Sequence, residues 1–454
     1  MRFLAVLIMA ALPTVAAAQE PAAQTTIKPT GLRFWSEHFE LNAEMLVQFR
    51  LTGQDERGGN STNGRDFANF RIPRARLSFN GYLFEPEFQY RLQLNFVRPA
   101  DQLVEVARFR LALGRALNVN IGQDRVPWDW ERRVPGQNLR FAERSYVNEV
   151  FHQDWGKGIW IDGEIGAEVP MLRYWFGAFN GVMRADNDFR NKDGALTQDT
   201  FSRFVDAEVM VTLRAETQPL GAISTSLGDN RGREEHDKFL VAAGLGVNWF
   251  SSGFNDGLIR GDTATVTPAS GRPRTQQETL ALTVDAHGRW YGASLDVAFY
   301  WRDTEFHNRG SNRFSPGNKN GISDLMDIGW SVEGGYFILP NELGVFARVN
   351  SFNADEFWGS DGIDSTSGHQ RAIRPDAMEF GVAANYYFQG DRLKFSLDIN
   401  YVDQQLAFSY RGAGTLLGVY NAPPSRRGGG LGSHPDSADH NSIWIIRLQI
   451  QWIL

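Results

Sequence analysis

The segment Ser442-Ile443-Trp444-Ile445-Ile446-Arg447-Leu448-Gln449-Ile450-Gln451-Trp452-Ile453-Leu454 places an apolar side chain at every even-numbered position from 444 onward. Side chains that alternate with a period of two indicate a β-strand with one apolar face. A strand that lies in hydrocarbon needs a partner for every backbone N–H and C=O group, and a closed barrel supplies those partners. The segment therefore predicts an antiparallel transmembrane β-barrel, provided that the rest of the chain repeats the pattern.

The same alternation recurs along the chain from about residue 39. Between residues 39 and 52, apolar residues such as Phe39, Met45 and Phe49 alternate with polar residues such as Gln48 and Arg50. Strands of soluble sandwiches are typically five or six residues long, whereas a tilted strand needs about ten to cross a bilayer. We count roughly sixteen segments of the longer kind, an even number as in bacterial barrels. The fold class expected is an all-β barrel of about sixteen strands.

The start of the chain differs from the rest. Residues 1–18 combine Arg2, a short apolar core and small residues, which predicts a secretory signal peptide cleaved after Ala18. Residues 19–38 then predict a periplasmic N-terminal segment. Residues 39–454 predict one outer-membrane barrel domain, because no linker or break in composition interrupts the pattern.

Composition agrees with a barrel in the bacterial outer membrane. After the signal peptide, no stretch approaches the roughly 18 uninterrupted apolar residues of a transmembrane helix. The chain has no cysteine, which excludes thiol catalysis, thiolate metal sites and a disulfide scaffold. Aromatic residues make up 13% of the chain, with 13 tryptophans, and fit the aromatic girdles of a barrel.

Long polar connections alternate with short turns, as outer loops and periplasmic turns do. The long stretches are 53–66, 124–156, 183–200, 251–277, 303–326, 351–377 and 403–442. One connection, residues 215–238, falls where the count requires a short turn. Either a strand is misassigned there or this turn carries an insertion.

Positive charge is concentrated in one part of a chain whose net charge is −7. Residues 65–144 hold fourteen arginines and no lysine against nine acidic residues, so this part carries +5 and the rest −12. A guanidinium is always charged and offers several donors to an oxyanion, so rows of arginine in a narrow pore favour anions. The candidates sit at lumen parity or in the long loop: Arg74, Arg76, Arg91, Arg108, Arg110, Arg125, Arg132, Arg133, Arg140 and Arg144.

The alternative for each arginine is an ion pair that only braces the barrel wall, since ion pairs across a lumen are common. The acidic residues available for such pairs are Glu87, Glu105, Asp129, Glu131 and Glu143.

Five blocks of sequence, in this order, resemble the phosphate-selective porin O and P family. The blocks are Arg74-Ala75-Arg76-Leu77, Gly122-Gln123-Asp124-Arg125-Val126-Pro127, Leu139-Arg140-Phe141-Ala142-Glu143-Arg144, Gly156-Lys157-Gly158-Ile159-Trp160-Ile161-Asp162-Gly163 and Phe176-Gly177-Ala178-Phe179-Asn180-Gly181. Two later blocks, Gly334-Gly335-Tyr336-Phe337 and Ala384-Asn385-Tyr386-Tyr387, resemble the family's distal strands. The resemblance implies a homotrimeric sixteen-stranded channel with a basic pore and a constriction loop after the fifth strand.

One block departs from the family pattern. Arg125 stands where members often carry lysine, and Asp124 replaces an aromatic residue, which adds a negative charge near the expected constriction. The function expected is passive diffusion of small anions, with phosphate as a candidate. The expected partners are these anions, outer-membrane lipid and lipopolysaccharide; no cofactor and no nucleic acid is expected.

Other solutes and activities give separate expectations. A general porin without solute preference is one alternative. A sugar or dicarboxylate porin would use loop aromatics such as Trp128, Trp130 and Phe141. A barrel hydrolase would need a nucleophile beside His287, but residues 329–333 lack the closing glycine of a nucleophile elbow. An adhesin is the remaining alternative. No metal is expected, although residues 434–440 contain histidines and carboxylates and residues 361–364 contain two aspartates.

Overall fold

The computed structural model describes residues 24–28, 31–57, 67–98, 103–153, 155–166, 172–180, 205–207, 209–223, 239–255, 274–307, 325–353, 357–359, 370–372, 377–405 and 440–454. The predicted signal peptide, the histidine and two aspartates of residues 434–439 and the aspartates of residues 361–364 lie outside these ranges, and His440 is the first residue of the last described range. No helix in the described ranges is long and apolar enough to cross a membrane.

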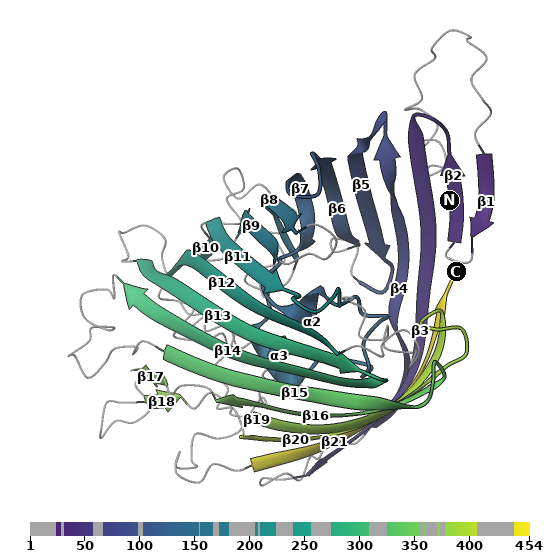
Figure 1. Cartoon of the computed structure of the whole chain (residues 1–454). Coiled ribbons are helices and arrows are strands. Elements are labelled where there is room, and N and C mark those ends of the chain that lie inside the picture. Colours follow the sequence, from purple (N-terminus) through teal and green to yellow (C-terminus); the bar gives the residue numbers. More distant parts are fainter. Residues whose placement is uncertain are drawn as a thin grey trace.

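Sixteen antiparallel strands form a closed barrel (Figure 1). Its strands are β3 (Phe39–Arg57), β4 (Phe67–Leu83), β5 (Glu85–Asn95), β6 (Val104–Ala112), β7 (Asn118–Arg125), β8 (Trp155–Ile165), β9 (Leu172–Asn180), β11 (Val209–Thr217), β12 (Leu240–Asn255), β13 (Arg274–Trp290), β14 (Ala293–His307), β15 (Leu325–Leu339), β16 (Leu343–Asn353), β19 (Ala377–Tyr387), β20 (Leu393–Gln405) and β21 (His440–Ile453). Each strand pairs with its neighbour in the sequence, and β21 pairs with β3 from Ser442–Arg57 to Ile453–Leu46. The predicted barrel is confirmed.

Five shorter strands complete the secondary structure of the described residues. They are β1 (Gln24–Lys28), β2 (Gly31–Trp35), β10 (Val205–Ala207), β17 (Phe357–Gly359) and β18 (Gln370–Ala372). Strands β1 and β2 form a hairpin, and β2 pairs with residues 40–43 of β3. Part of the segment predicted as a periplasmic extension is therefore an addition to the sheet, beside the first barrel strand.

The barrel is polar inside and apolar outside, as the alternation predicts. On β3, Gln48 and Arg50 are 0% and 2% exposed, whereas Phe49 between them is 51% exposed. On β21, Gln451 is 1% exposed and Trp452 is 50% exposed. An exposed apolar exterior over a buried polar interior is the arrangement that a lipid environment stabilises.

Several strands are longer than the sequence pattern indicated. β3 runs to Arg57, β12 to Asn255 and β13 starts at Arg274, inside stretches that we assigned to the loops 53–66 and 251–277. Those boundaries were wrong. Strand ends that project beyond the bilayer have no apolar face, so their composition does not distinguish them from loops.

The unexpectedly long connection at residues 215–238 joins two neighbouring barrel strands, and its first three residues belong to β11. β11 pairs with β9 on one side and β12 on the other, so no strand is missing between them. Other turns on the same rim are short: β13 and β14 are joined by Tyr291 and Gly292, which both have positive φ.

Candidate functional site

The connection between β7 and β8 folds into the barrel as the predicted constriction loop (Figure 1). It follows the fifth barrel strand and contains two short helices, α2 (Trp130–Arg133) and α3 (Tyr146–Phe151). Asp129 caps α2 by accepting from the Arg132 N–H at 2.7 Å, and Ser145 caps α3 by accepting from the Asn148 N–H at 3.2 Å. These caps satisfy N–H groups at the helix starts and fix where each helix begins.

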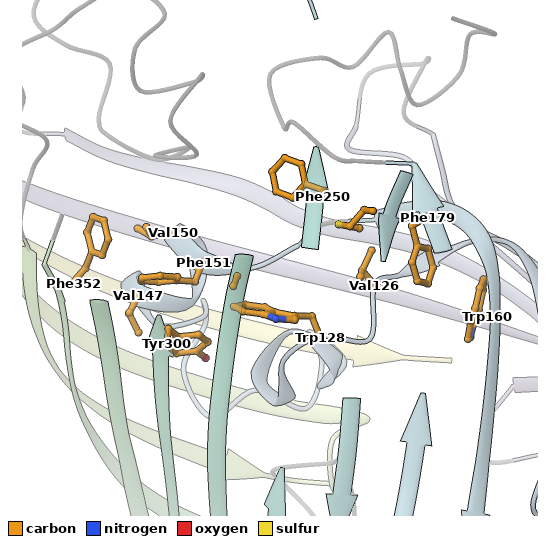
Figure 2. Packing of buried hydrophobic residues seen from close by; sticks show 12 residues of the cluster. Val126, Trp128, Val147, Val150, Phe151, Trp160, Phe179, Phe250, Tyr300 and Phe352 are labelled. Atoms are coloured by element: carbon orange, nitrogen blue, oxygen red, sulfur yellow. The ribbon is translucent and has the colours of Figure 1, made fainter. Parts of the chain in front are cut away.

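Aromatic side chains of the loop pack against one part of the barrel wall (Figure 2). Tyr300 of β14 lies between Trp128 and Phe151 of the loop, with ring centroids 5.8 and 5.3 Å away, and Phe151 meets Phe352 of β16 edge-on. Gly329 of β15 leaves space here, because a Cβ would overlap Val147. A glycine within a strand often marks such a close approach.

Three loop aromatics that a sugar porin would need are buried in this packing. Trp128, Trp130 and Phe141 are 0%, 4% and 2% exposed. Trp130 stacks on His287 of β13 at 4.0 Å, and Phe141 packs in a cluster with Phe337 and Tyr387. None of the three lines either lumen cavity described below, so their predicted role in solute stacking was wrong.

Polar contacts fix the loop backbone to β20 and to the barrel seam, which is the pair of strands β21 and β3 that closes the barrel. Asp398 of β20 accepts from the Ala142 N–H at 2.7 Å. Lys394 of β20 donates to the Gln137 and Leu139 carbonyls at 2.7 and 3.0 Å. Side chains from the seam strands also donate to the loop: Gln451 of β21 to the Gln137 carbonyl, and Arg50 of β3 to the Ala142 carbonyl. These bonds satisfy loop groups that have no helix or sheet partner.

The opposite part of the lumen remains open as two adjoining cavities. One has a volume of about 530 Å³ and reaches from β4 to β9, and the other, of about 510 Å³, reaches from β3 to β6. We call the lumen face of β4–β8 the open wall, and the lumen face of β12–β16, β19 and β20 the packed wall. Both cavities lie along the open wall.

Six of the ten predicted arginines line the cavities. They are Arg76, Arg91, Arg108, Arg110, Arg125 and Arg133. Arg108 pairs with Asp124 and Arg110 with Asp162, each at 2.9 Å, and these arginine side chains stay 24% and 27% exposed. Arg76 pairs with Glu105 at 2.7 Å. Their charge is thus partly balanced, but the guanidinium groups of Arg108 and Arg110 remain in contact with the lumen.

Arg91 differs from the other cavity arginines. It lines both cavities, and its one side-chain bond among the described residues goes to the neutral amide oxygen of Gln93 at 3.2 Å. It lies directly across from Arg108 in the pairing of β5 with β6. Like charges on directly opposite strand positions repel, so this pair adds positive potential to the lumen.

Arg125 and Arg133 mark the loop side of the larger cavity. Arg125 donates to the carbonyls of residues 132–134, at 3.0–3.2 Å, and its guanidinium lies 4.8 Å over the Trp155 ring. Arg133 pairs with Glu216 of β11 and lies 3.8 Å over Trp175. Carbonyls and aromatic faces hold these two guanidiniums in place.

The other four predicted arginines hold the loop instead of lining a cavity. Arg74 pairs with Glu143 at 2.9 Å, Arg132 with Glu149 at 3.2 Å, and Arg140 with Asp296 at 2.6 Å. Arg144 donates to the Val134 carbonyl at 2.6 Å. For this group the bracing alternative is what the structure shows, with Glu143 as one of the acidic partners named from the sequence.

Charged groups of the loop have shifted pKa values. Burial and the nearby Glu333 raise the pKa of Glu131 to about 7. Burial alone would raise the pKa of Glu143, but Arg74, Arg50 and Arg447 hold it below its usual range. Burial and Arg132 lower the pKa of Arg144 to about 10, which leaves it charged at neutral pH. The pKa of the Glu131 carboxyl thus lies near neutrality.

The histidine that a barrel hydrolase would use, His287, has hydrogen-bond partners on both sides of its ring. Both ring nitrogens of His287 contact carboxylates, Nδ1 with Asp296 at 2.7 Å and Nε2 with Asp285 at 2.8 Å. Neither nitrogen is left to activate a serine.

Sequence reasoning missed several cavity residues. Arg115, Asp162 and Gln137 line cavities, although only Asp162 stood in a quoted block and none was named as a site residue. Lumen parity alone would have found Asp162. Glycines at lumen parity within strands, such as Gly246 and Gly329, were the available signal for the side on which the loop lies.

The structure also explains the first glycine of the quoted Gly122-Gln-Asp-Arg block. Gly122 has φ +127°, and a Cβ there would overlap the Ala107 carbonyl of the neighbouring strand. Only glycine adopts this conformation readily at such a close approach.

Comparison with known proteins agrees with this structure. Residues 42–250 match the sequence model of the family described as phosphate-selective porin O and P. The match contains the five quoted blocks but not the two distal ones, which lie after residue 250. No curated protein sequence matches the chain.

Solved outer-membrane proteins are similar to this chain at low sequence identity. An anion-selective porin from Comamonas acidovorans has a TM-score of 0.51 and 9% identity, covering 91% of this chain and all (100%) of that one. The outer membrane channel DcaP of Acinetobacter baumannii has a TM-score of 0.49 and 10% identity, covering 91% of this chain and 98% of that one. OmpT of Vibrio cholerae has a TM-score of 0.47 and 11% identity, covering 91% of this chain and 100% of that one.

The match of residues 42–250 to a porin family model and the barrel fold both point to a channel. With the sequence match over residues 42–250 and a closed barrel of sixteen strands, the chain is identified as a bacterial outer-membrane porin whose N-terminal part matches the phosphate-selective porin O and P family.

Proposed function

We propose that this porin is anion-selective, and that small anions, phosphate among them, diffuse passively along the open wall between the two cavities. The observation that carries the proposal is Arg91. Among the described residues its guanidinium has no carboxylate partner, it lines both cavities, and it lies opposite Arg108. An anion passing this point exchanges water for guanidinium donors, whereas a cation meets two like charges.

The arginines form a series along the path. From β4 to the turn after β6, Arg76, Arg91, Arg108, Arg110 and Arg115 all line a cavity. Seven arginines and three carboxylates line the larger cavity, so its lining is net positive. A positive lining with low-dielectric walls raises the local concentration of anions.

The reversal potential of the purified protein in a planar bilayer under a KCl gradient tests the proposal. We expect anion selectivity, and inhibition of the chloride current by phosphate. Arg91→Gln should lower the chloride-to-potassium permeability ratio by about threefold or more, because it removes one unpaired charge from the path. Arg91→Lys is the matched control, since it keeps the charge and should keep most of the selectivity. A cation-selective wild type would contradict the proposal.

A sugar porin is the alternative, and the same recordings address it. Trp155, Trp160 and Trp175 line the larger cavity. The first two are each 5% exposed, and the guanidinium of Arg133 lies 3.8 Å over the ring of Trp175, so little aromatic surface is left for stacking on a sugar ring. Block by neutral sugars together with insensitivity to phosphate would favour that alternative.

We also propose that the porin is a homotrimer in contact with lipopolysaccharide, as the family resemblance implies. The apolar exterior of the barrel supports contact with lipid. Mass measurement of the protein in mild detergent tests the trimer, and a monomer at all concentrations would contradict it.

A further inference from the structure

The two cavities adjoin through residues that line both, and these residues come from two sides. The open wall supplies Gln89, Gln93 and four arginines, Arg76, Arg91, Arg108 and Arg110. The constriction loop supplies a single residue, Gln137. The passage from one cavity to the other therefore runs between the arginine-bearing strands and Gln137 of the loop.

The backbone of Gln137 is held at both ends of a tight turn. The Asn138 N–H donates to the Pro135 carbonyl at 2.9 Å. The Gln137 carbonyl accepts from Lys394 at 2.7 Å and from Gln451 at 3.1 Å. Gly136 lies so close to Arg74 that a Cβ would come within 2.8 Å of its Nε. The turn is thus fixed by its main chain, and the Gln137 side chain is not needed to hold it.

That side chain has no hydrogen bond within the described part of the chain, and it is partly exposed. Across the passage, Arg91 bonds only to Gln93 within the same part of the chain. A residue whose amide has two N–H donors therefore lies on the same passage as a guanidinium that forms no ion pair with a carboxylate among the described residues, although Glu44 lies within its electrostatic reach. Donors from two sides are what a small anion needs when it sheds water at a narrow point.

We propose that Gln137 is the loop-side selectivity residue of this porin: its amide donates to the permeating anion opposite Arg91. The inference rests on the proposed anion selectivity and adds to it the residue that faces the arginines. A neutral donor suits this position because it replaces part of the hydration shell without adding a second full charge that would hold the anion in the pore.

The experiment compares two neighbouring charge changes in the full-length protein. Gln137→Glu places a carboxylate on the passage, and Asn138→Asp places one on the next residue, which lines neither cavity. Reversal potentials under a KCl gradient are measured for both variants. We expect Gln137→Glu to lower the chloride-to-potassium permeability ratio by about threefold or more and Asn138→Asp to leave it near the wild-type value.

A neutral variant tests the donor itself. Gln137→Leu should raise the phosphate concentration that halves the chloride current by about threefold, because one hydrogen bond to the anion is lost. The heat-dependent mobility of each variant in gel electrophoresis reports whether the barrel is folded, and a variant that fails to fold is replaced by Gln137→Met.

The outcomes separate the two proposals. A cation-selective wild type overturns the proposed function. An anion-selective wild type with equal shifts for Gln137→Glu and Asn138→Asp shows an effect of net charge alone and overturns the role of Gln137. Unchanged phosphate inhibition in Gln137→Leu also overturns it.

Discussion

The open wall and the packed wall carry the same pairs of residue types in different surroundings. On the packed wall, Arg302 pairs with Asp327 at 2.7 Å and Arg348 with Glu379 at 2.5 Å, and these arginine side chains are 6% and 1% exposed. On the open wall, Arg108 and Arg110 make comparable pairs at 2.9 Å but stay about one-quarter exposed. The difference is the constriction loop, which covers one wall and leaves the other in contact with water.

The comparison shows that arginine content does not by itself identify a pore. An ion pair sealed beneath the loop fixes structure, because a buried charge is tolerated only with its partner. An ion pair that faces a cavity leaves part of the guanidinium available to a passing anion. The predictions below test how the loop produces this difference, from the largest expected effect to the smallest.

The largest effect on stability is expected at the ion pairs between Glu143 of the loop and two arginines of β3 and β4, which we call the clamp. Glu143 pairs with Arg50 and Arg74, whose side chains are 0% and 9% exposed. Glu143→Gln leaves two buried guanidinium groups without their carboxylate, and we expect a loss of about 2–4 kcal/mol in the free energy of unfolding. Unfolding in detergent, followed by gel mobility against temperature, measures the loss.

The same carboxylate predicts a dependence on acid. Because its pKa is held below the usual value in the folded protein, its contribution to stability is full above about pH 5 and is lost as the pH falls further. Wild type should lose more stability than Glu143→Gln in that acidic range. Equal losses in both proteins would show that the clamp contributes nothing.

A smaller effect is expected where the loop backbone passes over the packed wall. Gly246 of β12 lies against the Trp128 carbonyl, and a Cβ there would overlap it. Gly246→Ala should displace the loop at a cost of about 1–3 kcal/mol and open it to protease. Gly288→Ala in β13 is the matched control, since the nearest atom to its Cβ would be 3.8 Å away. Equal protease resistance in both variants would argue against a tight seat for the loop.

The smallest effect is expected at Glu131, which accepts from the Ser145 N–H and hydroxyl at 2.7 and 2.6 Å. Its pKa of about 7 lies above the unfolded value, so wild-type stability should fall as the pH rises from about 4.5 to 7. Glu131→Gln should remove that slope and be about 1–2 kcal/mol more stable than wild type at pH 8. Thermal unfolding at several pH values gives the stability of wild type and of Glu131→Gln as a function of pH. Parallel curves for the two proteins would refute the raised pKa of Glu131.

Side-chain alternation predicted the strands well because each strand carries its own signal. The parity of Gln48 and Phe49 is enough to place one inside and the other outside. Alternation also predicted correctly that Arg91, Arg108 and Arg110 face the lumen, where all three line a cavity.

The division of the arginines into two groups could not be predicted from parity. Arg140 lines neither of the two lumen cavities, because it forms an ion pair with Asp296, which is 156 positions away in the chain. The sequence gives no signal for that pairing. The open wall is the part of the lumen face that the loop leaves uncovered. The position of the loop depends on the whole barrel, so the pattern of a single strand does not reveal it. For the same reason Gln137, a residue of a short turn, carried no sequence signal of its role.

The contacts between the loop and the barrel seam have a consequence for the order of assembly. The Gln137 carbonyl accepts from Gln451, which follows it by 314 positions and lies in the strand that closes the barrel against β3. Contacts between such distant residues form slowly, because a long chain segment must be ordered first. The loop tip therefore reaches its final position only when the last strand is in place. Insertion of this porin should thus pass through a wide, leaky barrel, and narrowing of the channel should be the final step of maturation.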